Sequence, residues 1–236
     1  MHIEVISNVN EAQAERFTHR TAIVIDVLRA TSTIVAALEA GAAGILPVET
    51  VLEARALQGS GNLIAGERFC RKIPGFDLGN SPEEFTAVPV QGRRIVLTTT
   101  NGTRAIHKAM RAEHVLAGSI NNAAACARTA LDLRRDIVLL CAGSHDEFAL
   151  EDGLCAGLLI SELQAISPAP IEMNDIGSAM LGLYKGTSGS VQELVFSSTT
   201  GKRLCKNGSS RDVERCSQLN ISGIVPRMQG DMLVQN

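Results

Sequence analysis

The sequence predicts an α/β fold of three layers, α/β/α, with a mixed, largely parallel sheet. Three similar segments carry this prediction, and they begin at Ile23, Ile95 and Ile137. Each runs from an apolar stretch through a polar turn into a helical pattern, and repeated strand–helix units are typical of parallel sheets. Ligands of such proteins bind beyond the carboxyl ends of the strands. The three polar turns are therefore expected to meet at one edge of the sheet.

The bulk composition sets the class of protein. The 236 residues are 45% hydrophobic and 20% charged, which is enough apolar material for the core of one globular domain. A division into two similar lobes, about 1–135 and 136–236, is the alternative. The net charge is −3, the sequence contains no basic block, and Trp is absent, so a nucleic-acid partner is not expected.

The N-terminus and the cysteines indicate the compartment. No basic segment followed by an apolar run opens the sequence, and no apolar stretch approaches the roughly 18 residues of a membrane span. We therefore expect a cytoplasmic protein with no membrane partner. The six cysteines have no C-x-x-C spacing, which favours reduced, mostly buried thiols over disulfides or zinc ligands.

Hydrophobic periodicity and turn residues place the elements along the chain. Strands are expected at 3–7, 22–27, 45–48, 94–97, 115–117, from 137 onward and at 221–225. Helices are expected at about 31–40, 50–57, 81–85, 103–110, 122–133, 154–163, 191–196, 202–206 and 212–219.

Capping residues mark several helix ends. Thr50 and Glu53 fit a capping box, and Gly41 suits the position after a helix. Ser81, followed by proline, is a candidate N-cap, as is one of the hydroxyls at 31–33. The segment 59–80 is expected to be a long, Gly-rich loop, and such loops are often functional.

The polar turns and this loop supply the chemistry. Oxygen ligands without His or Cys suit Mg²⁺, while cations, hydroxyls and helix N-termini suit a phosphate or sulfonate. Together they favour metal-dependent phosphoryl hydrolysis. The carboxylates are Asp26, Glu67, Asp77, Glu147, Glu151 and Asp152; the cations are Arg29, Arg68, Arg71, Lys72 and Arg104; Thr98 to Asn101 add hydroxyl and amide donors.

Structural explanations compete with these assignments. Asp26 could end its strand as a turn residue, although an acid that closes a buried strand is costly unless it is paired. Thr31, Ser32 and Ser81 suit helix caps better than catalysis. Glu151 and Asp152 could complement a helix dipole. The cations of 68–72 alone would be an ordinary solvated surface.

Other phosphate-handling motifs fit poorly. A Walker A loop is absent. Asp26 resembles the strand-end aspartate of haloacid-dehalogenase-type phosphatases, but Leu28 stands where their second acid would be. Cys205 and Arg211 match the C-x5-R spacing of cysteine phosphatases, yet no buried strand leads into Cys205. We treat that match as chance.

Four longer motifs resemble a known family. They are Ile25-Asp26-Val27-Leu28-Arg29-Ala30-Thr31-Ser32-Thr33; Gly66-Glu67-Arg68 with Gly75-Phe76-Asp77-Leu78-Gly79-Asn80-Ser81-Pro82; Thr98-Thr99-Thr100-Asn101-Gly102-Thr103; and Cys141-Ala142-Gly143 with Leu150-Glu151-Asp152. In this order they look like the 2-phosphosulfolactate phosphatase (ComB) family. The resemblance implies an α/β, Mg²⁺-dependent phosphatase that converts 2-phospho-3-sulfolactate to 3-sulfolactate and phosphate in coenzyme M biosynthesis. Phe69-Cys70 and Ala149 depart from the family pattern and concern the fit of the substrate loop.

On this basis we expect a small phosphorylated, sulfonated acid as the substrate. The oligomeric state stays open, with a homo-oligomer as one alternative. Asp26 is either a nucleophile or a metal ligand. The expected catalytic residues are Asp26, Arg29, Glu67 and Asp152; the expected Mg²⁺ ligands are Asp26, Glu67, Asp152, Glu147 and Glu151; and the expected substrate-binding residues are Arg68, Arg71, Lys72, Asp77, Asn80, Ser81, Thr99, Thr100, Asn101, Gly102 and Thr103.

Two other functions compete with this hypothesis. One is a phosphatase of the same mechanism that acts on another phosphorylated hydroxy acid. The other is a non-catalytic anion-binding homologue.

Overall fold

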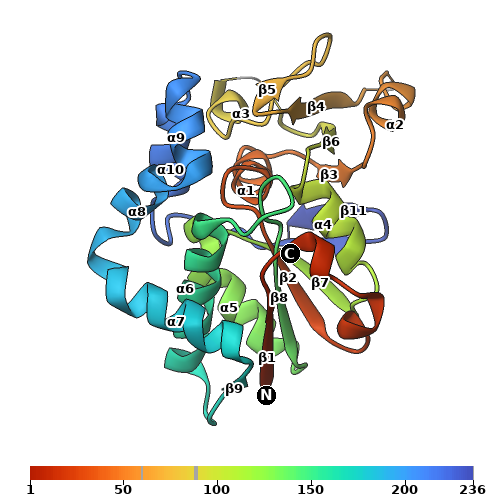
Figure 1. Cartoon of the computed structure of the whole chain (residues 1–236). Coiled ribbons are helices and arrows are strands. Elements are labelled where there is room, and N and C mark those ends of the chain that lie inside the picture. The colour runs from red at the N-terminus through yellow and green to blue at the C-terminus, as the bar shows by residue number, and fades with distance from the viewer. Residues whose placement is uncertain (60, 88–89, 236) are drawn as a thin grey trace.

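The computed structural model describes residues 1–59, 61–87 and 90–235, and its strands form one mixed sheet (Figure 1). The strand order is β5-β4-β6-β3-β11-β10-β7-β2-β8-β1-β9. Most neighbours run parallel, which confirms the predicted α/β class. The strands are β1 (His2–Ile6), β2 (Thr21–Ile25), β3 (Gly44–Pro47), β4 (Leu63–Arg68), β5 (Arg71–Lys72), β6 (Arg94–Thr98), β7 (His114–Gly118), β8 (Ile137–Cys141), β9 (Glu172–Met173), β10 (Pro226–Gln229) and β11 (Met232–Gln235).

Helices follow most of the parallel strands. The α-helices are α1 (Ala30–Glu39), α2 (Val51–Ala56), α3 (Glu84–Ala87), α4 (Gly102–Ala109), α5 (Ala123–Asp132), α6 (Leu150–Ile166), α7 (Asp175–Thr187), α8 (Val191–Ser197), α9 (Thr199–Lys206) and α10 (Ser210–Cys216). Short 3-10 turns are η1 (Val9–Glu11), η2 (Ala14–Phe17), η3 (Ile120–Asn122) and η4 (Ser188–Ser190). Among the described helices, none is both long and apolar enough to cross a bilayer.

The sheet consists of two parallel groups joined by a hairpin. Strands β3, β4 and β6 form one group, and β1, β2, β7, β8 and β9 form the other. The antiparallel hairpin β10–β11 lies between them and pairs with β7 on one side and β3 on the other. In Figure 1, β11 lies between the upper group around β3 and β6 and the lower group around β2 and β8. Helices α1 and α4 carry the chain from one group to the other.

Alternate side chains of β2 enter two different cores, as the three-layer fold requires. Ile23 and Ile25 pack with buried residues of α5 and α6, whereas Ala22 and Val24 pack with those of α1 and α4. Helices α8, α9 and α10 join the first core through the buried Val195, Leu204 and Val213, respectively. This packing fixes the C-terminal helices beside the strand ends.

The segment expected to be one long loop, 59–80, contains two strands. β4 runs parallel to β6, and β5 folds back on β4, so that Arg68 pairs with Arg71. Gly66 hides the strand from pattern analysis, because glycine has a low strand propensity. A side chain there would collide with the Thr98 carbonyl of β6. Glu67 therefore lies on the sheet, near the end of β4.

Helix ends were predicted with mixed success. The Thr50–Glu53 capping box and the positive φ of Gly41 after α1 are confirmed. The hydroxyls at 31–33 lie inside α1 rather than at its N-cap, and Ser81 bonds Asp212 instead of capping α3.

Two further corrections concern the C-terminal third. Residues 221–225 are irregular, and the strand begins at Pro226. Helix α7 was not predicted, because Gly177, Gly182 and Gly186 interrupt its helical pattern.

Candidate active site

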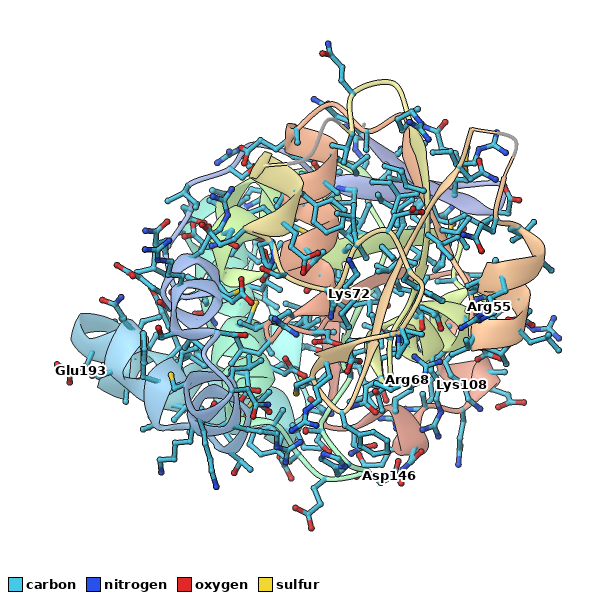
Figure 2. All side chains as sticks on the ribbon, turned by 90° about the horizontal axis from the view of Figure 1, so that it is seen from above. Arg55, Arg68, Lys72, Lys108, Asp146 and Glu193 are labelled. Carbon is cyan, nitrogen blue, oxygen red and sulfur yellow. The ribbon has the colours of Figure 1, made fainter. Side chains whose placement is uncertain are left out.

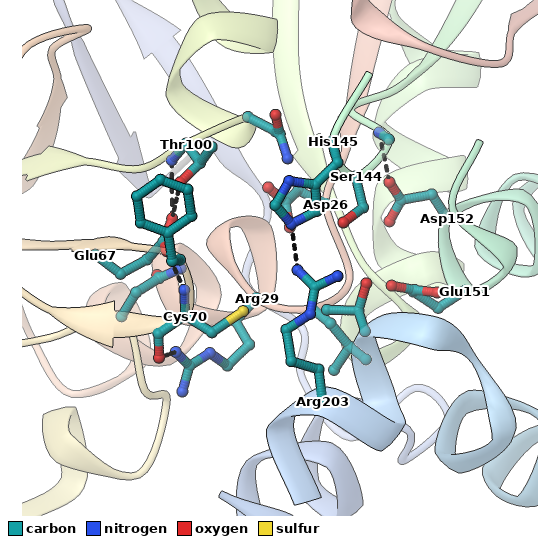
Figure 3. A pocket seen from close by; sticks show the side chains of 16 residues that line it. Asp26, Arg29, Glu67, Cys70, Thr100, Ser144, His145, Glu151, Asp152 and Arg203 are labelled. Atoms are coloured by element: carbon teal, nitrogen blue, oxygen red, sulfur yellow. Dashed lines mark hydrogen bonds between the residues drawn. The ribbon is translucent and has the colours of Figure 1, made fainter. Parts of the chain in front are cut away.

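The polar turns after β2, β6 and β8 meet around one pocket, together with the β4–β5 turn and helix α9 (Figure 3). Four carboxylates line it and all four are buried, so we call it the carboxylate pocket: Asp26, Glu67, Glu151 and Asp152. Asp26 follows β2, Glu67 lies in β4, and Glu151 and Asp152 lie in α6 after β8. The ends of these strands meet, so residues that are distant in sequence share one site. Asn80, Thr100 and Asn101 line the same pocket.

The backbone of Asp26 is held by the first turn of α1. The Thr31 hydroxyl accepts a hydrogen bond from the Asp26 N–H at 3.1 Å and donates one to the Asp26 carbonyl at 2.8 Å. The Asp26 side chain accepts a bond from the Ala30 N–H through Oδ1 at 3.2 Å. Gly102 packs against the other oxygen, because a Cβ built there would lie 2.5 Å from Oδ2. Asp26 is therefore fixed with little freedom to turn.

The electrostatic setting of Asp26 favours its neutral form. Burial, together with the charges of Glu67 and Glu151, raises the pKa of Asp26 to about 7, even though the Ala30 N–H and Arg29 act in the opposite direction. An acid that titrates near neutrality is suited to proton transfer or to binding a cation that replaces the proton.

Asp152 lies in the first turn of α6 and ties two strand ends together. Its Oδ1 accepts a bond from the Val27 N–H at 2.9 Å, and its Oδ2 accepts one from the Gly143 N–H at 3.0 Å. Burial, followed by the charges of Asp26 and Glu151, raises the pKa of Asp152 well above its usual range. The side chain thus joins the ends of β2 and β8 within the pocket.

Glu67, at the end of β4, holds two turns at once. Its Oε1 accepts bonds from the Thr100 N–H at 2.8 Å and from the Thr100 hydroxyl at 2.9 Å, while Oε2 accepts the Cys70 N–H at 2.7 Å. The carboxylate therefore fixes the start of α4 relative to the β4–β5 turn. Its geometry is that of a positioning residue whose oxygens are already engaged.

Arg29 is the buried cation of the pocket, and its partner comes from α10. Its Nη1 lies 2.5 Å from Oδ2 of Asp212, and its Nη2 donates to the Cys70 carbonyl at 3.3 Å. Asp212 also accepts a bond from the Ser81 hydroxyl at 2.5 Å. Asp212 was not predicted, because an acid inside a short polar helix carries no local sign of a distant partner.

Helix α9 adds residues that the sequence did not single out. Thr200 and Arg203 line the pocket, and Arg203 forms a hydrogen bond with the Nε2 of His145 across its mouth (Figure 3). Ser144, beside His145, also lines the pocket. The sequence pattern marked neither Thr200 nor Arg203, and it predicted only a short helix at 202–206 here.

Most of the cations expected to bind the substrate lie outside the carboxylate pocket. Arg68 bonds the Glu49 carbonyl and Thr98, and it lines a separate hollow with Thr99 and Arg104. Arg71 is exposed, and Lys72 bonds the Asp77 carbonyl. Figure 2 shows Arg68 and Lys72 separated along the β4–β5 hairpin.

Several other expected residues support the pocket without lining it. Asp77 accepts the Ile64 N–H at 2.8 Å, and Thr99 and Thr103 bond each other at the start of α4. Ser81 lines a neighbouring hollow, and Glu147 is exposed in another. Asp77, Thr99 and Thr103 thus stabilise segments next to the pocket, whereas Ser81 and Glu147 lie in adjacent hollows.

Comparison with known proteins connects this site to a family. A family model described as 2-phosphosulpholactate phosphatase matches residues 6–231. The chain belongs to this family. Three relatives carry the name probable 2-phosphosulfolactate phosphatase: that of Symbiobacterium thermophilum is 41% identical over 222 residues (92% of this chain, 95% of that protein), that of Thermotoga petrophila 41% over 218 (91% and 92%), and that of Clostridium tetani 33% over 236 (99% and 100%).

The two residues that match the cysteine-phosphatase spacing, Cys205 and Arg211, do not form a common site in this member of the 2-phosphosulpholactate phosphatase family. Cys205 lies in α9 and packs on the first core, and Arg211 lies in α10 beside a different hollow. Neither residue lines the carboxylate pocket. The spacing is therefore a coincidence of two consecutive helices.

Resemblance to the 2-phosphosulpholactate phosphatase family implies Mg²⁺, and the side chains of the carboxylate pocket decide whether such an ion could bind there. In the described part of the chain, no three Asp, Glu, His or Cys side chains come close enough to enclose a metal ion. Mg²⁺ does not require that, since it usually takes one or two carboxylates plus waters and phosphate oxygens. Oδ2 of Asp26 and both oxygens of Glu151 accept no hydrogen bond from the described residues, whereas Glu67 and Asp152 are fully engaged. Oδ2 of Asp26 and the Glu151 carboxylate are therefore oxygens of the pocket that remain available to a cation.

Proposed function

We propose that the protein is an Mg²⁺-dependent phosphatase that hydrolyses 2-phospho-3-sulfolactate to 3-sulfolactate and phosphate, the type of step used in coenzyme M biosynthesis. The names of its relatives support this substrate. The free state of the described cysteines supports a cytoplasmic location as part of the same proposal.

One observation carries the requirement for a metal: four buried carboxylates line the pocket that would receive an anionic ester. A phosphate cannot approach such a group favourably, because like charges repel strongly at low dielectric. A divalent cation held by Asp26 and Glu151 would neutralise charge on these carboxylates and on the phosphate of the ester, and it would polarise the phosphoryl group. Burial first, and then the charges of neighbouring carboxylates, raises the pKa values of Asp26 and Asp152, so both effects oppose a further anion here.

The protein's own groups supply the remaining functions. Thr100 and Asn101 precede α4 at the pocket wall, where helix N–H groups favour a phosphate. Glu67 fixes Thr100 in that position through its two bonds to Oε1. In one route Asp26 attacks phosphorus, the ester P–O bond breaks, 3-sulfolactate leaves with a proton from solvent, and water then cleaves the acyl phosphate to phosphate. In the other route Asp26 takes a proton from a water that attacks phosphorus and displaces 3-sulfolactate directly. In both routes its carboxylate must be ionised.

The test of this function is phosphate release from 2-phosphosulfolactate with Mg²⁺ and with a chelator. We expect turnover only with the metal, and a loss of at least about 100-fold for Asp26→Asn. Asp77→Asn is the matched control, because Asp77 lies outside the pocket and binds backbone only. Absence of metal-dependent turnover in the wild type would rule out the enzyme and favour the anion-binding homologue.

Acid quench with labelled phosphate separates the two roles of Asp26. A hydroxylamine-sensitive phosphoenzyme identifies the nucleophile, whereas none is formed if Asp26 only binds the metal or activates water.

Phe69 at the pocket supports testing a second substrate. Its side chain is 72% exposed and lines the carboxylate pocket, at a position where the sequence departs from the family pattern. A panel of phosphorylated hydroxy acids would then rank substrates by kcat/KM. A higher kcat/KM for an ester without a sulfonate would identify the alternative substrate.

A further inference from the structure

Arg203 spans the mouth of the carboxylate pocket from α9. Its guanidinium forms a hydrogen bond with the His145 ring, which lies on the loop after β8, and it lines the pocket together with Cys70 of the β4–β5 turn (Figure 3). The side chain therefore extends from α9 into the space between these two segments. It is half-buried, so its charge is partly removed from water.

The charge balance of the pocket singles out Arg203. Arg29 and Arg203 are the arginines that line it, and the charge of Arg29 is neutralised by Asp212 at 2.5 Å. Arg203 bonds the His145 ring, and it forms no ion pair with any described carboxylate. A partly desolvated guanidinium without an anion is a ready binding site for one.

Arg203 also stands where the pocket opens into a second hollow. This hollow shares Ser144, His145, Glu151, Thr200 and Arg203 with the carboxylate pocket and continues past Phe148. A ligand whose phosphate lies by Thr100 can therefore extend toward α9. Arg203 and the carboxylates therefore line one continuous cavity, and Glu151 and Arg203 lie where its two parts join.

We propose that Arg203, held by His145, binds the sulfonate of the substrate and so determines specificity. The proposal rests on the proposed function. The sulfonate is the better match because carboxylates suit Mg²⁺, whereas a weakly basic, three-oxygen anion suits the guanidinium fork. The phosphate and carboxylate of the substrate would then lie by the proposed metal position, and its sulfonate would lie by Arg203 of α9.

The test compares 2-phosphosulfolactate with 2-phospholactate, the same ester without the sulfonate. Arg203→Gln is expected to lower kcat/KM for the sulfonated ester by about 10- to 100-fold, mainly through KM. With 2-phospholactate the change stays within about 3-fold. Arg203→Lys should retain part of the preference, because it keeps the charge but loses the fork. Lys202→Gln, an exposed neighbour on α9, is the control and should match the wild type.

Two outcomes overturn the proposal: equal losses with both esters, or no loss with either. Thermal unfolding of each variant separates a folding defect from a binding defect, and Arg203→Lys supplies the answer if Arg203→Gln is unstable. If the wild type hydrolyses neither ester, the phosphatase function fails, and binding of 3-sulfolactate decides this proposal separately. A rise in Tm with 3-sulfolactate that disappears in Arg203→Gln supports it, whereas no rise in the wild type contradicts it.

Discussion

Arg29 and Asp212 are 183 positions apart in sequence and form a buried ion pair in which each side chain is at most 6% exposed. The pair connects the turn after β2 to α10, so the C-terminal helices are held against Arg29, a residue that lines the carboxylate pocket. Ser81 joins the same carboxylate from the opposite side. This contact makes the position of α9, and hence of Arg203, depend on Arg29.

Removing one member of this pair should be costly. Asp212→Asn leaves the Arg29 charge buried without an anion, and we expect a loss of about 3 to 5 kcal/mol in the free energy of unfolding. Urea denaturation measures it. The control is Glu113→Gln, which breaks the exposed Arg135–Glu113 pair and should cost less than about 1 kcal/mol. Similar losses for the two variants would contradict this account.

Gly102 should not tolerate a side chain. Gly102→Ala places a Cβ 2.5 Å from Oδ2 of Asp26 and closer still to the Ala30 Cβ of α1, so α4, α1 or Asp26 must shift. We expect activity to fall at least about 10-fold, because small displacements of reacting groups are costly. Gly182→Ala in α7 is the matched control: nothing lies within 4 Å of its built Cβ, and a gain of up to about 1 kcal/mol in stability is expected. An active Gly102→Ala enzyme would refute the close packing.

The stability of the metal-free protein should fall as the pH rises. The pKa of Asp26 is about 7 in the folded protein against an ordinary value of 3.8, so between these values only the folded protein keeps the proton. The unfolded chain therefore binds fewer protons, and the free energy of unfolding decreases with pH, by up to about 4 kcal/mol from this residue. Tm measured with chelator from about pH 5 to 8 tests the slope.

Asp26→Asn should flatten that slope and raise the Tm at pH 8, whereas Asp132→Asn on the exposed end of α5 should leave it unchanged. Mg²⁺ should restore stability most at high pH, because it binds the ionised carboxylate. A metal-free protein whose Tm rises between pH 5 and 8 would show that Asp26 is ionised without the metal.

Glu67 should control access to Cys70. In Glu67→Gln one carboxylate oxygen is replaced by an NH2 group, which cannot accept a hydrogen bond from a backbone N–H. One of the two backbone bonds is therefore lost, and the β4–β5 turn becomes less well held. We expect a cost of about 1 to 3 kcal/mol and faster labelling of the half-buried Cys70 thiol by a thiol reagent. Asp77→Ala, which removes the acceptor of the Ile64 N–H on β4, should not change that labelling rate. Unchanged Cys70 labelling in Glu67→Gln would count against the positioning role.

The sequence predicted best where local chemistry decides the structure. The segment from Ile23 to Ile34 is a strand, a turn and a helix as expected, and the Thr50 capping box forms because both partners are three residues apart. Asp26 and Asp152 could be proposed because buried strand ends and helix starts leave local patterns, and they converge because β2 and β8 are parallel. Glu67 was proposed from a Gly-rich segment in which the strand β4 was not predicted.

Contacts between distant elements could not be predicted in this way. Asp212 and Arg203 lie in short amphipathic helices whose sequences satisfy a helix without any reference to the pocket. Arg68 and Lys72 were grouped with the site because they flank Glu67, but strand alternation and the β5 hairpin direct them elsewhere. Periodicity describes one element, while the site is built from several.

The hairpin β10–β11 has a consequence for how the protein folds. It is the only described part of the sheet that touches both parallel groups, and it comes from residues 226–235. During synthesis, β2 and β6 must therefore wait for more than a hundred further residues before the sheet between them is closed. Such long sequence separations slow folding and leave strand edges exposed for longer. Ribosome-bound chains that lack this hairpin are expected to depend on chaperones.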